Sequence, residues 1–150
     1  AVALGSRFVL PLFFVIATLL GTGLHVMAID LPATELTISL SVLGVGSLLM
    51  FSISAPIALF AALFAVAGLF HGHAYGEAIF GAEATPMIAY LAGFGPTQYA
   101  IAVVAGTVIV SFWGKAAGLA QNIPARLAGA MVAGAGVLLV GEKAIGAIFA

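Results

Sequence analysis

The sequence has 150 residues, of which 64% are hydrophobic and only 6% are charged, with a formal net charge of −1. Charged residues make up about 25% of an ordinary soluble domain, so this chain lacks the charge to cover a soluble globule and is predicted to be an integral membrane protein in contact with the lipid bilayer. The charge excludes a basic nucleic-acid-binding surface, and the absence of cysteine excludes disulfides and thiolate metal sites.

Long, continuous apolar runs predict about five transmembrane helices, because a bilayer-spanning helix needs about 20 mostly apolar residues. The alternating pattern of a membrane β-barrel is absent. The expected fold class is therefore an all-α integral membrane protein, a compact helical bundle that forms a single domain over residues 1–150. The predicted spans cover residues 8–29, 36–53, 56–79, 87–112 and 123–143.

The connections between the spans add detail. A very short turn at residues 54–56 predicts that the second and third spans are antiparallel neighbours. In the fourth span, Gly95 and Pro96 predict a kinked or broken helix, because proline removes a helical hydrogen bond. At the end of the fifth span, Glu142 and Lys143 are interpreted as an interfacial pair.

The charged residues indicate an orientation. If five spans alternate, the carboxylates of Asp30, Glu35 and Glu83 fall on one side of the membrane, opposite the cations. By the positive-inside rule, the basic side is cytoplasmic. We therefore expect a bacterial-type plasma (inner) membrane, or another energised membrane, in which the cytoplasmic loops carry Arg7, Lys115 and Arg126.

A polar stretch interrupts the third span. Residues 70–77, Phe-His-Gly-His-Ala-Tyr-Gly-Glu, contain two of the three histidines and one of the five carboxylates of the chain. Burying a polar group without a partner costs roughly 2–7 kcal/mol, and ionisable residues inside a membrane usually serve a function. A functional site is therefore predicted at this stretch.

Helical geometry divides this stretch between two faces. His73 and Glu77 are four residues apart and share one face, whereas His71 and Tyr75 share another. One continuous helix cannot bring both histidines to one ion. Either the glycines unwind the segment, or each histidine works with partners on another helix. A stripe of Gly68, Gly72 and Gly76 would let a second helix approach closely and bring its side chains against His71.

Imidazole and carboxylate groups together suit a divalent transition metal, because neutral imidazole binds nickel, cobalt, copper and zinc and carboxylate oxygen can complete the shell. Glu77 can be a ligand, or it can orient His73 by accepting its other ring N–H. A structural packing role is the competing interpretation for a single histidine such as His25. The predicted metal ligands are His71, His73 and Glu77, with weaker candidates His25, Asp30 and Tyr75.

At these residues the chain resembles the HupE/UreJ family, small membrane proteins associated with hydrogenase and urease gene sets and regarded as nickel or cobalt permeases. The second signature of the family is similar to Phe-His-Gly-x-Ala-x-Gly with a glutamate after it. The matching residues in this chain are Phe70, His71, Gly72, Ala74, Gly76 and Glu77. The family's other signature, a histidine followed five residues later by Asp-His, lies in its first membrane helix and has no counterpart here. We expect either that the sequence begins after that helix or that the chain is a divergent member without that half of the metal site.

The resemblance implies a secondary permease for Ni²⁺ or Co²⁺ rather than an enzyme, with the metal as the transported ion and no permanently bound cofactor. The alternative is a non-transporting accessory or structural subunit of a larger membrane (bioenergetic) complex that keeps the same fold. Homo-oligomers and larger complexes both stay open as partners, because small-residue faces do not distinguish them. An intramembrane hydrolase is disfavoured, since Ser111 has no assigned base and the G-x-S-x-G motif is absent.

Overall fold

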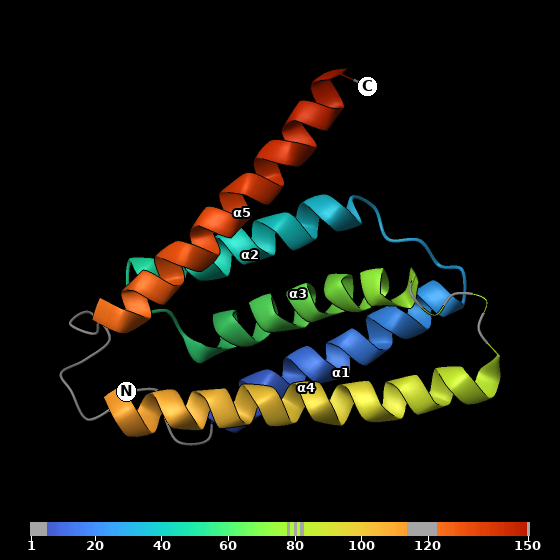
Figure 1. Cartoon of the computed structure of the whole chain (residues 1–150), viewed down its shortest axis with the longest axis horizontal. Helices are drawn as coiled ribbons and strands as arrows, with labels where there is room; N and C mark the ends of the chain where they lie inside the picture. The colour runs from blue at the N-terminus through green and yellow to red at the C-terminus, as the bar shows by residue number, and fades with distance from the viewer. Residues whose placement is uncertain (1–5, 78, 80, 82, 114–122, 150) are drawn as a thin grey trace.

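The computed structural model describes residues 6–77, 79, 81, 83–113 and 123–149. Within these residues it is all-helical, which confirms the predicted fold class (Figure 1). Each helix overlaps one predicted span. The helices are α1 (Ser6–Val26), α2 (Thr34–Met50), α3 (Ile57–Glu77), α4 (Ala84–Trp113) and α5 (Ile123–Phe149).

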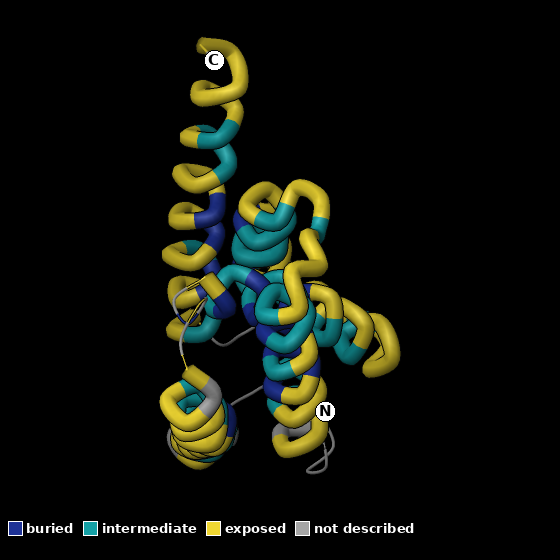
Figure 2. Tube along the Cα trace, turned by 90° about the vertical axis from the view of Figure 1, so that its right-hand side faces the viewer, coloured by how far each residue is buried: buried dark blue, intermediate teal, exposed yellow. Residues whose placement is uncertain are grey.

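Four of these helices, α1, α3, α4 and α5, are long and apolar enough to cross a membrane, whereas α2 has only 17 residues. Large apolar side chains such as Leu20, Ile101 and Leu138 lie exposed on the outer faces of the helices, where lipid would cover them. In Figure 2 the buried residues follow narrow strips on which the helices face one another. The burial pattern therefore agrees with a membrane protein.

The closest packing on α3 comes from α1, against the predicted glycine stripe. A methyl group at Gly68 would collide with the backbone carbonyl of Phe14, and one at Gly72 with that of Thr18. The two helices are therefore in backbone contact, as expected for small residues between membrane helices. The buried hydroxyl of Thr22 on α1 adds a bond to the other helix, donating to the carbonyl of Gly72 at 2.8 Å.

A second close pair is formed by α2 and α5. Added methyl groups at Gly46, Gly129 and Gly136 would strike the backbone of the opposite helix. At one end of this pair the Arg126 Nε donates to the carbonyl of Met50, the last residue of α2, at 3.0 Å. A cation there also interacts favourably with the negative end of the α2 dipole.

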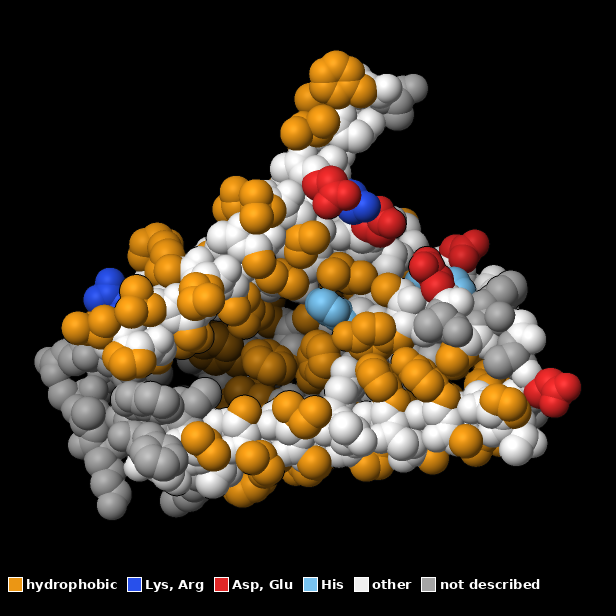
Figure 3. All heavy atoms as spheres, viewed as in Figure 1, with side chains coloured by type: hydrophobic (Ala, Val, Ile, Leu, Met, Phe, Trp, Pro, Cys, Tyr) orange, Lys and Arg blue, Asp and Glu red, His pale blue; other side chains and the backbone are white. Residues whose placement is uncertain are grey.

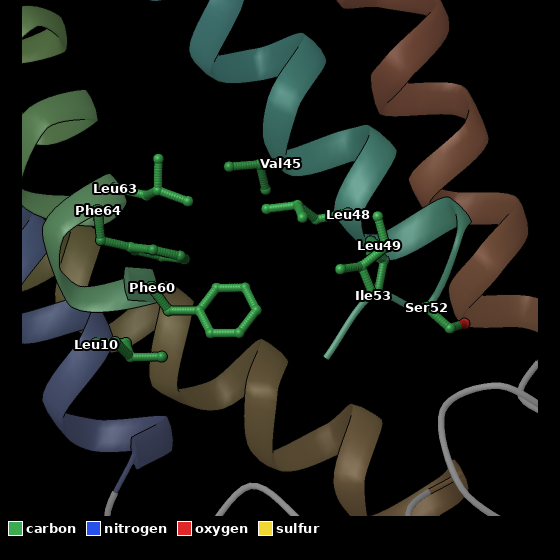
Figure 4. Close-up of a pocket in the computed structure, with 9 residues that line it drawn as sticks. All are labelled: Leu10, Val45, Leu48, Leu49, Ser52, Ile53, Phe60, Leu63 and Phe64. Carbon is green, nitrogen blue, oxygen red and sulfur yellow. The ribbon is translucent and has the colours of Figure 1, made fainter. Parts of the chain in front are cut away.

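The two pairs meet along a looser seam between α2 and α3, which are antiparallel neighbours as predicted (Figure 1). Near the α2–α3 turn this seam holds an apolar pocket of about 250 Å³, into which aliphatic and aromatic side chains of both helices point (Figure 4). Small residues thus bring α1 to α3 and α5 to α2, while larger side chains keep the two pairs apart.

The fourth helix is continuous from Ala84 to Trp113 and contains Pro96. Of the two forms predicted for this region, a break does not occur, and Figure 1 shows one gently curved ribbon. Proline removes a single helical hydrogen bond, and the remaining hydrogen bonds of this 30-residue helix keep it continuous. Lys115, one of the cations from which the membrane orientation was predicted, follows this helix and lies outside the described residues.

The end of α1 is a Schellman motif. The N–H of Ile29 donates to the carbonyl of Leu24 at 3.0 Å, and the N–H of Ala28 donates to that of His25 at 2.9 Å. Ala28 occupies the left-handed position with φ 57°, where glycine is usual because it has no Cβ. This turn fixes the direction in which the chain leaves α1 and places the carbonyl of Ile29.

Replacing Ala28 with glycine is therefore expected to stabilise the protein by about 0.5–1 kcal/mol. The substitution removes a left-handed conformational cost of roughly 1–2 kcal/mol, partly offset by the greater freedom of glycine in the unfolded chain. Thermal unfolding in detergent measures the change. Ala62, exposed inside α3, is the control: Ala62→Gly should destabilise by about 0.5–1 kcal/mol. Destabilisation by both substitutions would contradict the assignment.

Candidate metal site

An open pocket of about 430 Å³ lies where α1 and α3 end and α2 begins. Polar residues dominate its lining, and acidic side chains gather at this end of the molecule in the view of Figure 3. The ionisable residues that line it are His25, Asp30, Glu35, His73, Glu77 and Lys143. We call this the acidic pocket.

His73 is the buried member of the acidic pocket, with 4% of its surface exposed. Its Nε2 lies 3.1 Å from the carbonyl oxygen of Ile29, so Nε2 carries the proton and donates it. The neutral ring then has its lone pair on Nδ1, which is buried and has no hydrogen-bond partner in the described structure. A carbonyl that holds one ring N–H and leaves the other nitrogen free is the usual arrangement of a metal-binding histidine.

His25 lies beside His73, with ring centroids 4.6 Å apart and ring planes at 86°. Gly76 permits this approach, since a methyl group there would collide with the Cβ and ring atoms of His25. The sequence ranked His25 as a weaker candidate. The packing of α1 on the glycine stripe brings its imidazole against that of His73.

The carboxylates of the acidic pocket come from three separate places in the chain. Asp30 follows the Schellman turn, Glu35 is in the first turn of α2 and Glu77 ends α3. All three are exposed. They share the pocket lining with the two imidazoles and so give this end of the bundle a negative charge.

The cation at the pocket is Lys143 of α5, whose Nζ lies 2.6 Å from Glu35 Oε2. The sequence interpretation paired Lys143 with its neighbour Glu142, and the structure corrects this. The physical reason is the α2–α5 packing, which brings the first turn of α2 against this part of α5. Lys143 therefore lines the acidic pocket rather than forming a separate interfacial pair.

His71 lies on the other side of the glycine stripe, in a pocket of about 200 Å³ lined mainly by apolar side chains at the seam with α2. The hydroxyl of Ser41 donates to the carbonyl of Ile38 at 2.7 Å and accepts from His71 Nε2 at 3.2 Å. The side chain that α1 brings against this ring is Phe14, with centroids 5.9 Å apart. The glycine stripe was expected to bring the side chains of its partner helix against His71, and α1 does so with Phe14. At the end of the stripe α1 also brings the imidazole of His25 beside His73.

Tyr75, the last of the weaker candidates, packs on α4. Its ring meets Phe94 edge-on with centroids 5.0 Å apart, and it is not among the described residues lining the acidic pocket.

α3 is helical throughout residues 57–77, so each histidine works with partners on another helix. Among the described residues, no three His, Asp or Glu side chains lie close enough to hold one ion. The ligand set His71, His73 and Glu77 stays a prediction.

Sequence reasoning missed the places of Glu35 and Lys143 and the role of the Ile29 carbonyl. A signal for Lys143 was present in the sequence. Gly129, Gly136 and Lys143 are spaced by seven residues, so they share one helix face, and both glycines are in backbone contact with α2. Nothing in the sequence marked the Ile29 carbonyl, because its direction follows from the turn after α1.

Comparison with known proteins identifies a family. The family described as HupE / UreJ protein matches residues 1–139. Protein HupE of Rhizobium leguminosarum bv. viciae is 34% identical over 149 residues, which cover 94% of this chain and 72% of that protein. No solved structure matches the chain significantly.

Proposed function

Because the chain belongs to the HupE/UreJ family, we propose that it is a secondary permease that moves Ni²⁺ or Co²⁺ into the cell on an ion path that includes residues 70–77. The family consists of accessory or transport proteins rather than catalysts, which supports a non-enzymatic role. The resemblance to hydrogenase- and urease-associated proteins supports these two metals.

The observation that carries the proposal is the free Nδ1 of His73. A buried, unpartnered ring nitrogen at the wall of an acidic pocket has a cost that a bound cation would remove. Imidazole nitrogen suits Ni²⁺ and Co²⁺, and the carboxylates Asp30, Glu35 and Glu77 in the lining of the same pocket attract a cation. An incomplete, open set of ligands also allows the ion to leave, as transport requires.

In this proposal the acidic pocket faces the outer side of the membrane, and the position of Arg126 supports that orientation. Arg126 lies at the opposite end of α2 and α5 from Lys143 and Glu35, and the positive-inside rule assigns that end to the cytoplasm. Metal would then reach the pocket from outside, and His71 at the α2–α3 seam would lie further along the path.

Metal accumulation in cells expressing the full chain tests the proposal. The double variant His71→Ala, Glu77→Ala is expected to lower Ni²⁺ or Co²⁺ accumulation at least about tenfold, because loss of even an outer partner of a metal site costs 10–100-fold. Glu83→Gln, which removes an exposed carboxylate outside the described lining of the pocket, is the control and should leave accumulation unchanged. Unchanged accumulation in the double variant would exclude this path and favour the non-transporting accessory subunit.

A further inference from the structure

The acidic pocket contains a cation of its own. Among the described residues that line it, Lys143 is the one with a permanent positive charge, and it is bound to one of the three carboxylates, Glu35. With both histidines neutral, Asp30, Glu35, Glu77 and Lys143 together carry a charge of −2. This charge is equal and opposite to that of one divalent metal ion.

The packing of α5 holds Lys143 in this place. Gly136 is against Leu43 of α2, and Lys143 lies seven residues further along α5 on the same face. Arg126 anchors the other end of α5 on Met50. The α2–α5 pair therefore fixes the register in which the ammonium group reaches the first turn of α2.

We propose that Lys143 is an affinity-setting residue of the pocket, an internal cation that competes with the metal ion for Glu35. The inference rests on the proposed function, since it concerns the same pocket. A metal ion that engages Glu35 has to displace the Lys143 ammonium, and any ion in the pocket is repelled by it. The buried, unpartnered Nδ1 of His73 in the same wall indicates that a cation, rather than acidic surface alone, belongs there.

The consequence for transport is an upper limit on affinity. Three carboxylates around one pocket would attract a divalent ion strongly if no positive charge opposed them, because each carboxylate adds Coulomb attraction. Lys143 offsets one of them and is available to pair with Glu35 when the ion departs. Binding at the pocket is thereby made weak enough for release.

Titration of Co²⁺ into the purified full chain in nanodiscs tests the inference, with visible absorption as a reporter of imidazole ligation. Lys143→Gln is expected to bind Co²⁺ on the order of five-fold more tightly at low ionic strength, with a steeper salt dependence. Lys143→Arg keeps the charge and should stay within about two-fold of the unmodified protein. Arg126→Gln removes a cation at the far end and should not change the affinity.

The double variant Glu35→Gln, Lys143→Gln keeps the pocket charge at −2 and should bind Co²⁺ with nearly the affinity of the unmodified protein. Thermal unfolding checks that each variant is folded. If Lys143→Gln does not fold, the double variant provides the test instead. The role of Lys143 would be overturned if folded Lys143→Gln bound Co²⁺ no more tightly than the unmodified protein. It would also be overturned if the double variant lost more than about tenfold in Co²⁺ affinity.

The two proposals fail in different ways. If the unmodified protein binds Co²⁺ and loses it with His73→Ala, while Lys143→Gln changes nothing, only the role of Lys143 is wrong. If no protein in the series binds Co²⁺ at millimolar concentration, the acidic pocket is not a metal site and both proposals are wrong.

Discussion

Replacement of His73 with alanine is expected to weaken Co²⁺ and Ni²⁺ binding to the acidic pocket by on the order of 100-fold or more, since loss of a hydrogen-bonding partner of a metal ligand already costs 10–100-fold. His73 contributes the buried nitrogen of the pocket, and its ring is held by the Ile29 carbonyl so that Nδ1 has no other role in the described structure. Isothermal titration of the purified protein measures the affinity, and metal accumulation in cells should fall with it.

His71→Ala is the matched control for this prediction. It removes the same side chain two residues away, but His71 lines the seam pocket with Ser41 and not the acidic pocket. We expect His71→Ala to bind Co²⁺ with an affinity within about threefold of the unmodified protein, because a substitution in the seam pocket removes no ligand from the acidic pocket. Its effect on accumulation should be larger than its effect on binding. Equal losses of binding in the two variants would contradict the separation of the histidines seen in the structure.

Replacement of Gly72 with alanine is expected to destabilise the protein by about 3 kcal/mol, at the upper end of the range for overpacking. The added methyl group would collide with the Thr18 backbone, which cannot move aside as a flexible side chain can. Separation of α1 from α3 would also lengthen the Thr22 hydrogen bond to the Gly72 carbonyl. Thermal unfolding in detergent, followed by circular dichroism, measures the loss.

Gly23→Ala is the control for helix propensity and glycine content. Gly23 is also helical, on α1, but no atom lies within 4 Å of an added methyl group. Alanine should therefore be neutral or stabilise the helix by up to about 1 kcal/mol. A similar loss of stability at both positions would show that α1 and α3 are not packed through the glycine stripe.

The same packing links stability to the site. α1 reaches the glycine stripe of α3 along its length, and the last contact of that stripe, Gly76, brings His25 beside His73. A variant that separates these helices should therefore lose metal binding together with stability. The α2–α5 pair contributes Glu35 and Lys143 from the other side, so the acidic pocket depends on both pairs.

Much of the fold follows from composition and local pattern. Apolar runs of about 20 residues specify membrane helices, and the helices α1 to α5 begin and end within a few residues of most predicted spans. The polar stretch of residues 70–77 is recognisable by its contrast with an apolar chain, and the 3.6-residue period of a helix is enough to place His71 and His73 on different faces. The glycine stripe likewise predicts a close helix neighbour.

The sequence alone therefore determined a helical membrane protein of the HupE/UreJ kind, with one polar stretch whose two histidines face different partners. Only the tertiary structure decided which partners those are: His25 and the Ile29 carbonyl for His73, and Ser41 for His71. It also decided that Lys143 meets Glu35 rather than Glu142. The reason is that helical periodicity fixes the direction of a side chain relative to its own axis, whereas the neighbour it meets depends on the register between helices, which is set by backbone contacts at glycines far apart in the chain.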